Sequence, residues 1–306
     1  MLNKIIIGTR GSKLSLAYAN KVKNLISKTD LTVAKKIKIE KIKTSGDVFQ
    51  NKKISEIGGK NLFCKEIEDK LIKKEIDIAV HSLKDMDSVE TKGLIIQAYI
   101  ERNDPRESFI SKKFKKISEL NNAKIGSSSR RRELQLKLLN KKIKIENIRG
   151  NVDTRIKKVE SGEYDGAVLA LAGLKELNLE NHAREIFPLK DFLPTAGQGI
   201  IAVQCRDDDY DIKKILNKIN HSQTQICALA ERNFLKTLGG DCDTAVGCNV
   251  IFNRQKLELK AQLFSDDGKK VFNIVKSGKI SEPKLLGRLA GEEILKKSIN
   301  NFSKKR

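Results

Sequence analysis

Residues 62–81, LFCKEIEDKLIKKEIDIAVH, contain two different hydrophobic patterns in succession. The first part spaces its apolar residues about four apart, which predicts a helix over residues 62–74. Residues 76–81 form a short apolar run with one charge, which predicts a buried strand. Upstream, residues 36–43 alternate apolar and charged residues and predict another strand. Strand, helix and strand in this order indicate a βαβ unit and therefore a mainly parallel sheet.

The same alternation continues on both sides of this unit. Residues 4–8 predict a first strand and residues 12–27 a helix. Residues 45–60 are polar and rich in glycine, and a loop of this length is uncommon unless it has a function. A second α/β segment starts near residues 103–105. Its predicted strands are residues 123–126, 143–148 and 167–171, and its predicted helices are residues 129–140 and 152–161.

The last third of the chain has a different order of elements. Residues 194–199, PTAGQG, predict a hinge, and the strand predicted at 200–204 returns to the first domain. A capping box at residues 222–225 opens a helix to about residue 237. Three strands and a helix then follow, which is typical of an α+β domain. We therefore expect three domains, made of residues 1–100 with 199–219, residues 103–193, and residues 222–306.

The composition indicates a folded protein. The chain has 306 residues, of which 39% are hydrophobic and 33% charged, which is too apolar for a disordered chain. No apolar stretch is long enough to span a bilayer, and the first residues resemble a strand more than a signal peptide. Because the cysteines form no C-x-x-C pair, we expect no disulfide framework, no metal site and a reducing cytoplasm. The cysteines are Cys64, Cys205, Cys227, Cys242 and Cys248.

The positive charge has two explanations. The chain has 61 basic and 39 acidic residues, a formal net charge of +22. Lysines are spread everywhere and fit a solvated surface. Arginines suit carboxylates and phosphates, so their concentration indicates a polyanion, either nucleic acid or a small polycarboxylate. An aromatic content of 5% without Trp weighs against nucleic acid. Half of the 14 arginines lie in one stretch: Arg102, Arg106, Arg130, Arg131, Arg132, Arg149 and Arg155.

One candidate site follows the buried strand at residues 76–81. Lys84 and Asp85 come directly after it. Ligands of open α/β sheets bind at the carboxyl ends of strands, so these side chains are expected to face a cleft. A surface ion pair at the end of a strand is the simpler alternative. His81 is more typical of a packed histidine than of a metal ligand.

Two further candidates lie where a predicted strand leads into a predicted helix. GSSSRRR, residues 126–132, places arginines in the first turn of a helix, and RGNVDTR, residues 149–155, places Asn151 at a helix start. Cations there oppose the helix dipole unless an anionic ligand is present. An ordinary basic helix start on the surface is the alternative. Two such sites indicate a ligand with several anionic groups.

Cys242 differs from the other cysteines because it lies in a glycine-rich turn, LGGDCD. Glycine lets the backbone come close to a ligand and leaves room for an adduct on the sulfur. Most single cysteines are simply small buried apolar residues.

Together, these segments resemble the hydroxymethylbilane synthases, also called porphobilinogen deaminases. The resemblance extends from about residue 4 to about residue 250 and adds little over the last 50 residues. The segments that carry it are TRGSKLSLA (9–17), SGD (45–47), GGKNLF (58–63), DIAVHSLKD (77–85), DPRE (104–107), RR (131–132), RGNVDTR (149–155), AGL (172–174), GQG (197–199) and the turn around Cys242.

The resemblance implies an α/β fold with two domains of the type II periplasmic-binding-protein kind and a small C-terminal α+β domain. It implies a dipyrromethane cofactor joined to Cys242 through a thioether. The implied reaction, in porphyrin and heme biosynthesis, joins four porphobilinogen molecules head to tail, releases ammonia at each step and yields hydroxymethylbilane. The implied enzyme is a cytoplasmic monomer without nucleic-acid or membrane partners. A cytosolic anion-binding sensor with the same bilobal fold is the alternative.

The resemblance also implies roles for single residues. Asp85 would balance the charge of a cationic pyrrole intermediate and help remove its proton, with Lys84 beside it. The implied cofactor-binding residues are Cys242, Lys84, Asp85, Ser128, Ser129, Arg131 and Arg132. The implied substrate-binding residues are Arg10, Ser12, Phe63, Arg149, Arg155 and Gln198.

Three positions depart from the family pattern. Glu176 stands where the family often has Arg, so one carboxylate contact is in doubt unless Lys175 replaces it. Asp87 and Ala245 each replace a common Pro, which changes only the stiffness of two loops.

Overall fold

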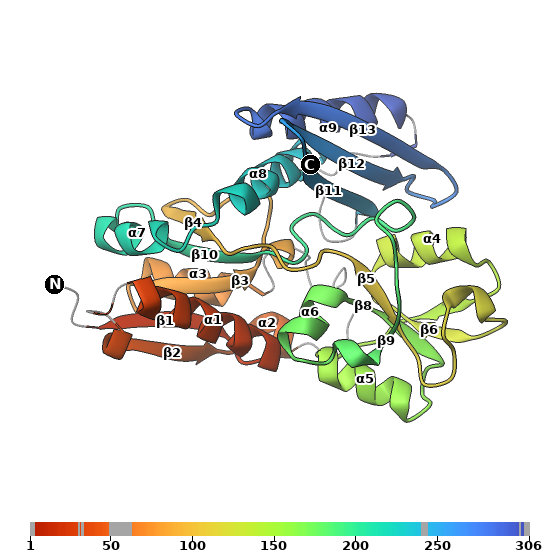
Figure 1. Cartoon of the computed structure of the whole chain (residues 1–306), viewed down its shortest axis with the longest axis horizontal. Helices are drawn as coiled ribbons and strands as arrows, with labels where there is room; N and C mark the ends of the chain where they lie inside the picture. Colours follow the sequence, from red (N-terminus) through yellow and green to blue (C-terminus); the bar gives the residue numbers. More distant parts are fainter. Residues whose placement is uncertain are drawn as a thin grey trace. The chain divides into compact units, whose positions relative to one another are not determined.

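The computed structural model describes residues 4–29, 31, 34–48, 63–239, 244–299 and 301–302. The predictions for Cys242 and for most of the glycine-rich loop, residues 49–60, lie outside these ranges. The chain forms two compact units, residues 1–103 with 199–226, and residues 104–198 with 227–306 (Figure 1). Each unit is described separately below.

The first unit contains a five-stranded sheet with the order β2-β1-β3-β10-β4. Strands β1, β2 and β3 run parallel, and β10 runs antiparallel to both of its neighbours. β10 therefore does return to this sheet, as expected from its sequence. The strands are β1 (Ile5–Arg10), β2 (Ile37–Ile42), β3 (Ile78–Ser82), β4 (Leu94–Tyr99) and β10 (Ile201–Arg206).

Helices cover both faces of this sheet. α1 (Lys13–Thr29) and α7 (Tyr210–Asn217) share one apolar core with Ile5 and Ile7 of β1. α3 (Lys65–Ile72) packs with Ile6, which points to the opposite face. Successive side chains of a strand point to opposite faces, so the continuous apolar run of β1 is explained by burial on both sides.

The second unit contains a sheet with the order β7-β6-β8-β5-β9. Relative to the first sheet, β6, β7 and β8 take the places of β1, β2 and β3, and antiparallel β5 takes that of β10. Both sheets therefore have the same strand order. The strands are β5 (Glu107–Ile110), β6 (Lys124–Gly126), β7 (Lys144–Glu146), β8 (Gly166–Ala170) and β9 (Ala183–Ile186). The helices are α4 (Arg130–Leu139), α5 (Val152–Glu160) and α6 (Leu171–Glu176).

A smaller antiparallel sheet, β11-β12-β13, completes the chain (Figure 1). α9 packs closely on α8, because a Cβ at Gly287 would lie 2.1 Å from the carbonyl oxygen of Ala230. The expected fold class, two α/β sheet domains and a small α+β domain, is confirmed. These elements are α8 (Ser222–Leu238), β11 (Val246–Asn253), β12 (Lys256–Phe264), β13 (Val271–Lys279) and α9 (Pro283–Lys297).

Within the second unit, α4 contacts the small sheet directly. Leu134 of α4 forms an apolar cluster with Ala245 and Phe264. The backbone N–H of Cys248 donates to the carbonyl oxygen of Pro194 at 2.8 Å. Because Leu136 of α4 also packs with Ile125 of β6, α4 contacts both sheets of the unit.

Two local predictions were wrong. The polar segment that begins at Ser45 starts with a helical turn, α2 (Ser45–Val48), instead of a loop. α8 begins at Ser222 as predicted, but His221 caps it, because its Nδ1 accepts from the backbone N–H of Thr224 at 3.3 Å. The imidazole thus takes the place that the sequence pattern assigned to a hydroxyl.

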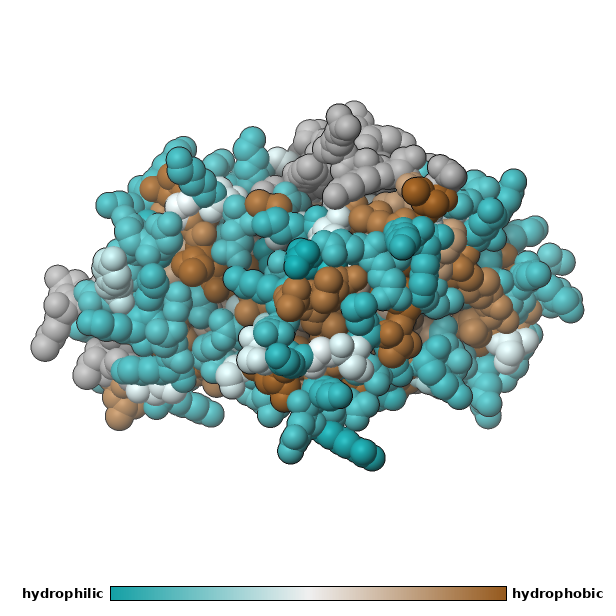
Figure 2. All heavy atoms as spheres, turned by 90° about the horizontal axis from the view of Figure 1, so that it is seen from above, coloured by the Kyte–Doolittle hydropathy of each residue, from teal (hydrophilic) through white to brown (hydrophobic). Residues whose placement is uncertain are grey.

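Hydrophilic side chains cover most of the face shown in Figure 2, with smaller hydrophobic patches between them. This agrees with the interpretation of the lysines as solvated surface. Among the described residues, no helix is long and apolar enough to cross a membrane.

Candidate active site

In the first unit, polar side chains gather at the carboxyl ends of three neighbouring parallel strands. Arg10 is the last residue of β1. Asp47 lies in the turn that follows β2, and Lys84 and Asp85 lie in a 3-10 turn, η3 (Leu83–Asp85), that follows β3. Because the strand order is β2-β1-β3, these side chains start from one edge of the sheet, where open α/β folds bind ligands.

Arg10 makes two strong contacts within this unit. Its Nη2 lies 2.5 Å from Oδ1 of Asp47, and its guanidinium lies 4.2 Å from the centre of the Phe63 ring. Burial raises the pKa of Asp47, but the hydrogen bonds from Arg10 and Thr44 outweigh this and lower it below its usual range. Two of the predicted substrate-binding residues, Arg10 and Phe63, therefore contact each other.

Ser12 has a local structural contact. Its Oγ accepts from the backbone N–H of Ser15 at 3.1 Å and lies 2.8 Å from the Ser15 hydroxyl. It therefore caps the first turn of α1. A role for Ser12 in substrate binding stays a prediction.

The backbone fixes the position of Asp85. The N–H of Leu83 donates to the carbonyl of Ile200 at 3.0 Å, and the thiol of Cys64 donates to the carbonyl of Asp85 at 3.7 Å. Burial, and then the negative charge of Asp85, raise the pKa of the Cys64 thiol well above its usual value. Cys64 is thus a neutral thiol. Asp85 is half-buried in the turn that follows β3.

His81 is a packed histidine. It is 5% exposed, and burial lowers its pKa to about 4, so it is neutral near pH 7. This favours a role for His81 in packing over a role as a metal ligand.

In the second unit, two loops at the strand ends are joined by hydrogen bonds. The N–H of Ser127 donates to the carbonyl of Glu146 at 2.8 Å. The hydroxyl of Ser128 donates to the carbonyl of Ile148, next to Arg149. The loop between β6 and α4 therefore lies against the loop between β7 and α5. Both predicted anion-binding helix starts belong to this pair of loops.

At the start of α5, the backbone conformation depends on a glycine. Gly150 has a φ of +110°, which L side chains rarely adopt. Its carbonyl accepts from Nε of Arg155 at 2.8 Å. Burial lowers the pKa of Arg149. Asn151 stands at the N-cap as predicted, but its side chain makes no capping hydrogen bond.

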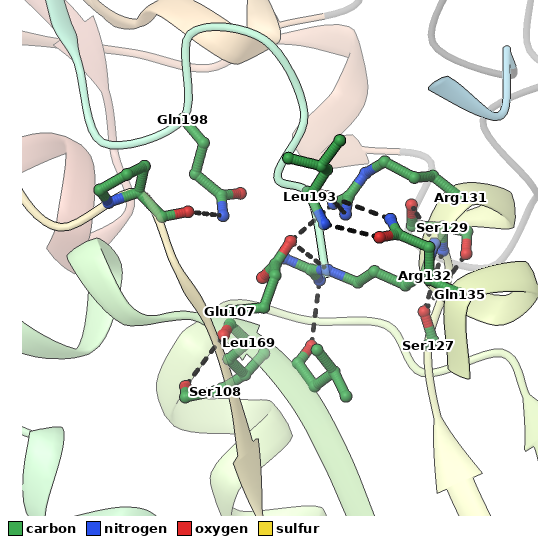
Figure 3. A network of polar contacts seen from close by, with 12 residues as sticks. Glu107, Ser108, Ser127, Ser129, Arg131, Arg132, Gln135, Leu169, Leu193 and Gln198 are labelled. Carbon is green, nitrogen blue, oxygen red and sulfur yellow. Dashed lines mark hydrogen bonds and ion pairs between the residues drawn. The ribbon is translucent and has the colours of Figure 1, made fainter. Parts of the chain in front are cut away.

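The three arginines at the start of α4 have different environments. Arg130 is largely exposed and pairs with Glu133 at 2.9 Å. Arg131 and Arg132 are 4% and 8% exposed and both pair with Glu107, which is fully buried (Figure 3). Burial lowers the pKa of Arg131, although Glu107 opposes this effect. Removing one partner from such a buried pair costs roughly 3–5 kcal/mol.

Sequence reasoning did not assign a role to Glu107. A signal was present, because a charged residue opens the otherwise uncharged strand Glu107–Ile110, and a buried charge needs a partner. Sequence reasoning gave no role to Asp47 either. Like Glu107, it belongs to a segment that carried the resemblance.

Gln198 is fully buried within the second unit, and its Nε2 donates to the carbonyl of Pro105 at 2.7 Å (Figure 3). Next to it, the N–H of Gly197 donates to the buried carboxylate of Glu231 at 2.6 Å. The amide of Gln198 therefore holds two backbone segments of this unit together.

Lys175 contacts Asp104 at 3.3 Å, and Arg106 also binds this carboxylate. Burial raises the pKa of Asp104, but the Arg106 hydrogen bonds outweigh it and lower the value to about 2. Lys175 is therefore partly neutralised by Asp104. Glu176 stands where the family often has Arg, and a carboxylate contact by Lys175 in place of that arginine stays a prediction.

Cys242 lies outside the described residues, and the described chain resumes at Thr244. The next residue, Ala245, contacts Leu134 of α4. The other cysteines, Cys64, Cys205, Cys227 and Cys248, are buried, which confirms them as packing positions.

Known protein families match almost the whole chain. The model of the porphobilinogen deaminase, dipyromethane cofactor binding domain, matches residues 5–214, and that of the porphobilinogen deaminase C-terminal domain matches residues 225–296. This chain belongs to the porphobilinogen deaminase family. The porphobilinogen deaminase of Ehrlichia chaffeensis is 46% identical over 86% of this chain and 88% of its own length. That of Chlorobium phaeovibrioides is 41% identical over 99% and 97%.

The solved structures that resemble this chain include two with low sequence identity. The methionine-binding protein MetQ is 12% identical, with a TM-score of 0.44 over 71% of this chain and 90% of its own. The periplasmic VFT2 domain of BvgS from Bordetella pertussis, as a double mutant, is 14% identical, with a TM-score of 0.43 over 71% and 85%.

Proposed function

We propose that this chain is a hydroxymethylbilane synthase, which joins four porphobilinogen molecules head to tail and releases ammonia at each step. Membership of the porphobilinogen deaminase family supports this activity. The observation from the structure that carries it is the position of α4. The basic start of this helix is one turn from Leu134, which packs with Ala245, and Ala245 stands three residues after Cys242 in the sequence.

The described residues fit the dipyrromethane cofactor that the family model names. The cofactor carries acetate and propionate groups, and the paired loops before α4 and α5 offer hydroxyl, guanidinium and backbone N–H donors. Ser128, Ser129, Arg131 and Arg132 would hold it, with a thioether from Cys242. When bound, the dipyrromethane supplies the free pyrrole carbon to which the first porphobilinogen is joined.

Asp85 and Lys84 would act on the incoming substrate. Loss of ammonia makes the substrate pyrrole cationic, and a carboxylate near its ring N–H stabilises that charge and accepts the final proton. Asp85 has the required chemistry and lies at the end of a buried strand, which keeps its backbone in place. Lys84 would bind a carboxylate of the same molecule.

Substrate carboxylates would be bound by Arg10, Arg149 and Arg155, with Ser12 and Gln198 assisting. A guanidinium binds a carboxylate through two parallel hydrogen bonds, which fixes direction as well as distance. Phe63 would stack on a pyrrole ring when Arg10 leaves it.

The remaining parts of the proposal concern the whole protein. It would act as a cytoplasmic monomer, without a nucleic-acid or membrane partner. Its three domains would be residues 1–100 with 199–219, residues 103–193, and residues 222–306. The small sheet contacts α4 in the second unit, which is why these last two domains form one compact body in the structure.

The attachment of the cofactor gives the direct test. The intact mass of the purified protein should exceed the sequence mass by a dipyrromethane, and peptide mapping should place it on Cys242. Cys242→Ser should lose most of the adduct and of the activity, because a hydroxyl is a far weaker nucleophile than a thiolate. Cys205→Ser, at a buried packing position, is the matched control and should keep both. An active protein without any adduct would refute the proposal.

A further inference from the structure

The first unit contains a cavity that is lined by none of the residues placed in the candidate active site. Its volume is about 480 Å³, which lies within the range of roughly 300–1,000 Å³ that is usual for small-molecule sites. The lining residues come from one face of α1, from residues 100–103 after β4, and from residues 218–221 between α7 and α8. All of them belong to the first unit.

The lining combines apolar side chains with an excess of positive charge. Ile100 and Ile219 are 2% and 9% exposed and give the cavity an apolar part. Three basic residues and one acidic residue also line it, so their net charge is 3 − 1 = +2 apart from His221. The charged residues are Lys21, Arg102, Lys218 and Glu101.

This combination defines the kind of molecule that fits. Small-molecule sites bury an apolar frame and use a few polar groups to fix its orientation. The net charge favours an anion with two or more negative groups. His221, the residue that caps α8, also lines the cavity, so the positive end of the dipole of this helix adds to the charge. A ring compound with two or three carboxylates has both required properties.

The cavity is also lined by the segments that connect the two units. The chain crosses between the units after residue 103, before residue 199 and after residue 226. The N–H of Asn103 donates to the carbonyl of Gly199 at 2.8 Å, so the first two connections are hydrogen-bonded to each other. The N–H of Arg102 donates to the hydroxyl of Thr224 in α8, the helix of the third connection, at 3.0 Å. A molecule in the cavity would therefore contact two of these connected segments.

On the basis of the proposed function, we propose that this cavity is a second, non-catalytic site for a small ring compound with two or three carboxylates, and that its occupation slows chain elongation. The reaction uses Asp85 of one unit and the arginine loops of the other while the attached chain lengthens, so the units must adjust to each other. A ligand that binds one arrangement of the connecting segments more tightly shifts the protein towards that arrangement and hinders this adjustment.

Binding is tested first with a readout that needs no activity. The probe is benzene-1,3,5-tricarboxylate, and the readout is hydrogen exchange of the backbone N–H groups of Arg102 and Asn103, followed by mass spectrometry. At saturating probe their exchange should slow about fivefold, because opening of these hydrogen bonds is coupled to binding. The uncharged analogue 1,3,5-benzenetrimethanol should have no effect.

Two double variants with the same change of charge locate the site. K21Q/K218Q removes two cations that line the cavity and should lose the protection by the probe. K23Q/K214Q removes two cations of α1 and α7 that do not line it and should keep the protection. If either double variant does not fold, Lys218→Gln and Lys214→Gln, both at exposed positions, repeat the comparison.

The effect on elongation is separated from competition at the catalytic site by steady-state kinetics. A carboxylate probe that competes with porphobilinogen raises KM, whereas occupation of the cavity lowers kcat. In the wild type and in K23Q/K214Q the probe should lower kcat about fivefold. In K21Q/K218Q it should raise KM only, and without probe this variant should have the wild-type kcat.

The outcomes distinguish this proposal from the proposed function. A protein without porphobilinogen consumption refutes the proposed function, while hydrogen exchange still tests the cavity. Protection that persists in K21Q/K218Q, or that the uncharged analogue also gives, overturns the site. Protection in the wild type with an unchanged kcat overturns the effect on elongation.

Discussion

At the residue scale, burial determines what each polar side chain can do. Glu107 and His81 are both buried, but Glu107 accepts three hydrogen bonds from two arginines, whereas loss of solvation keeps His81 neutral. Asp85 lies at the same kind of strand end as Arg10 and remains half-buried, where a substrate can approach it. The proposed chemistry therefore depends on one carboxylate.

Asp85→Asn should lower turnover by about 100-fold or more, because an amide of the same shape neither balances a cation nor accepts a proton. The melting temperature should stay at the wild-type value. Porphobilinogen consumption and thermal unfolding are the two measurements. Asp69→Asn, the same change on the exposed face of α3, is the matched control and should leave both unchanged. Near-normal consumption by the Asp85 variant would rule out the role of this carboxylate.

At the element scale, strands that end in polar loops and helices that begin there form the candidate site. Helix starts leave backbone N–H groups without partners inside the helix, and anions bind to them. α5 begins three residues after Arg149, and Arg155 lies in its first turn. The arginines are therefore placed by the elements themselves, unlike the surface lysines.

Arg149→Leu and Arg155→Leu should each slow chain elongation by about tenfold or more, because each loses a two-point carboxylate contact. Lys35→Leu and Lys270→Leu remove the same charge from exposed positions and serve as controls. Their effect on the rate of hydroxymethylbilane formation should be small. If all four changes were equal, the general charge of the protein would matter and the arginine sites would not.

The contact between α8 and α9 allows a test of packing. Gly287→Ala should destabilise the protein by about 2–3 kcal/mol, because the added Cβ would meet the backbone of Ala230, which cannot move aside within a helix. Urea unfolding measures this change. Lys284→Ala, on the exposed side of α9, should change the stability little. A fully stable Gly287 variant would show that the two helices can separate without cost.

The sequence predicted the long elements well and the short ones poorly. α1, β3 and α4 have strong hydrophobic patterns and lie within a few residues of the predicted bounds. The strands β5 and β9 span only four residues each, and pairing with neighbours, not local pattern, makes them strands. The same holds for the site. Motifs placed Arg131 and Arg132 at a helix start, but only the three-dimensional structure shows that Glu107 lies between them.

At the scale of the whole molecule, the chain passes twice between the two α/β sheets. Along the chain, β4 of the first sheet is followed by β5, the first strand of the second sheet. β10 follows the last strand of the second sheet, β9, and belongs again to the first sheet. The family models span both sheets and the small domain, and relatives match over nearly their full length. The positions that the proposed reaction needs are thus distributed over both units.

The position of β10 in the first sheet has a consequence for folding during synthesis on the ribosome. β10 lies between β3 and β4, and its residues Ile201, Val203 and Cys205 belong to the first apolar core. Translation delivers β3 and β4 more than a hundred residues before their shared neighbour. Until then, the inner edges of both strands are open to other chains. The N-terminal sheet therefore cannot be completed before β10 has been synthesised.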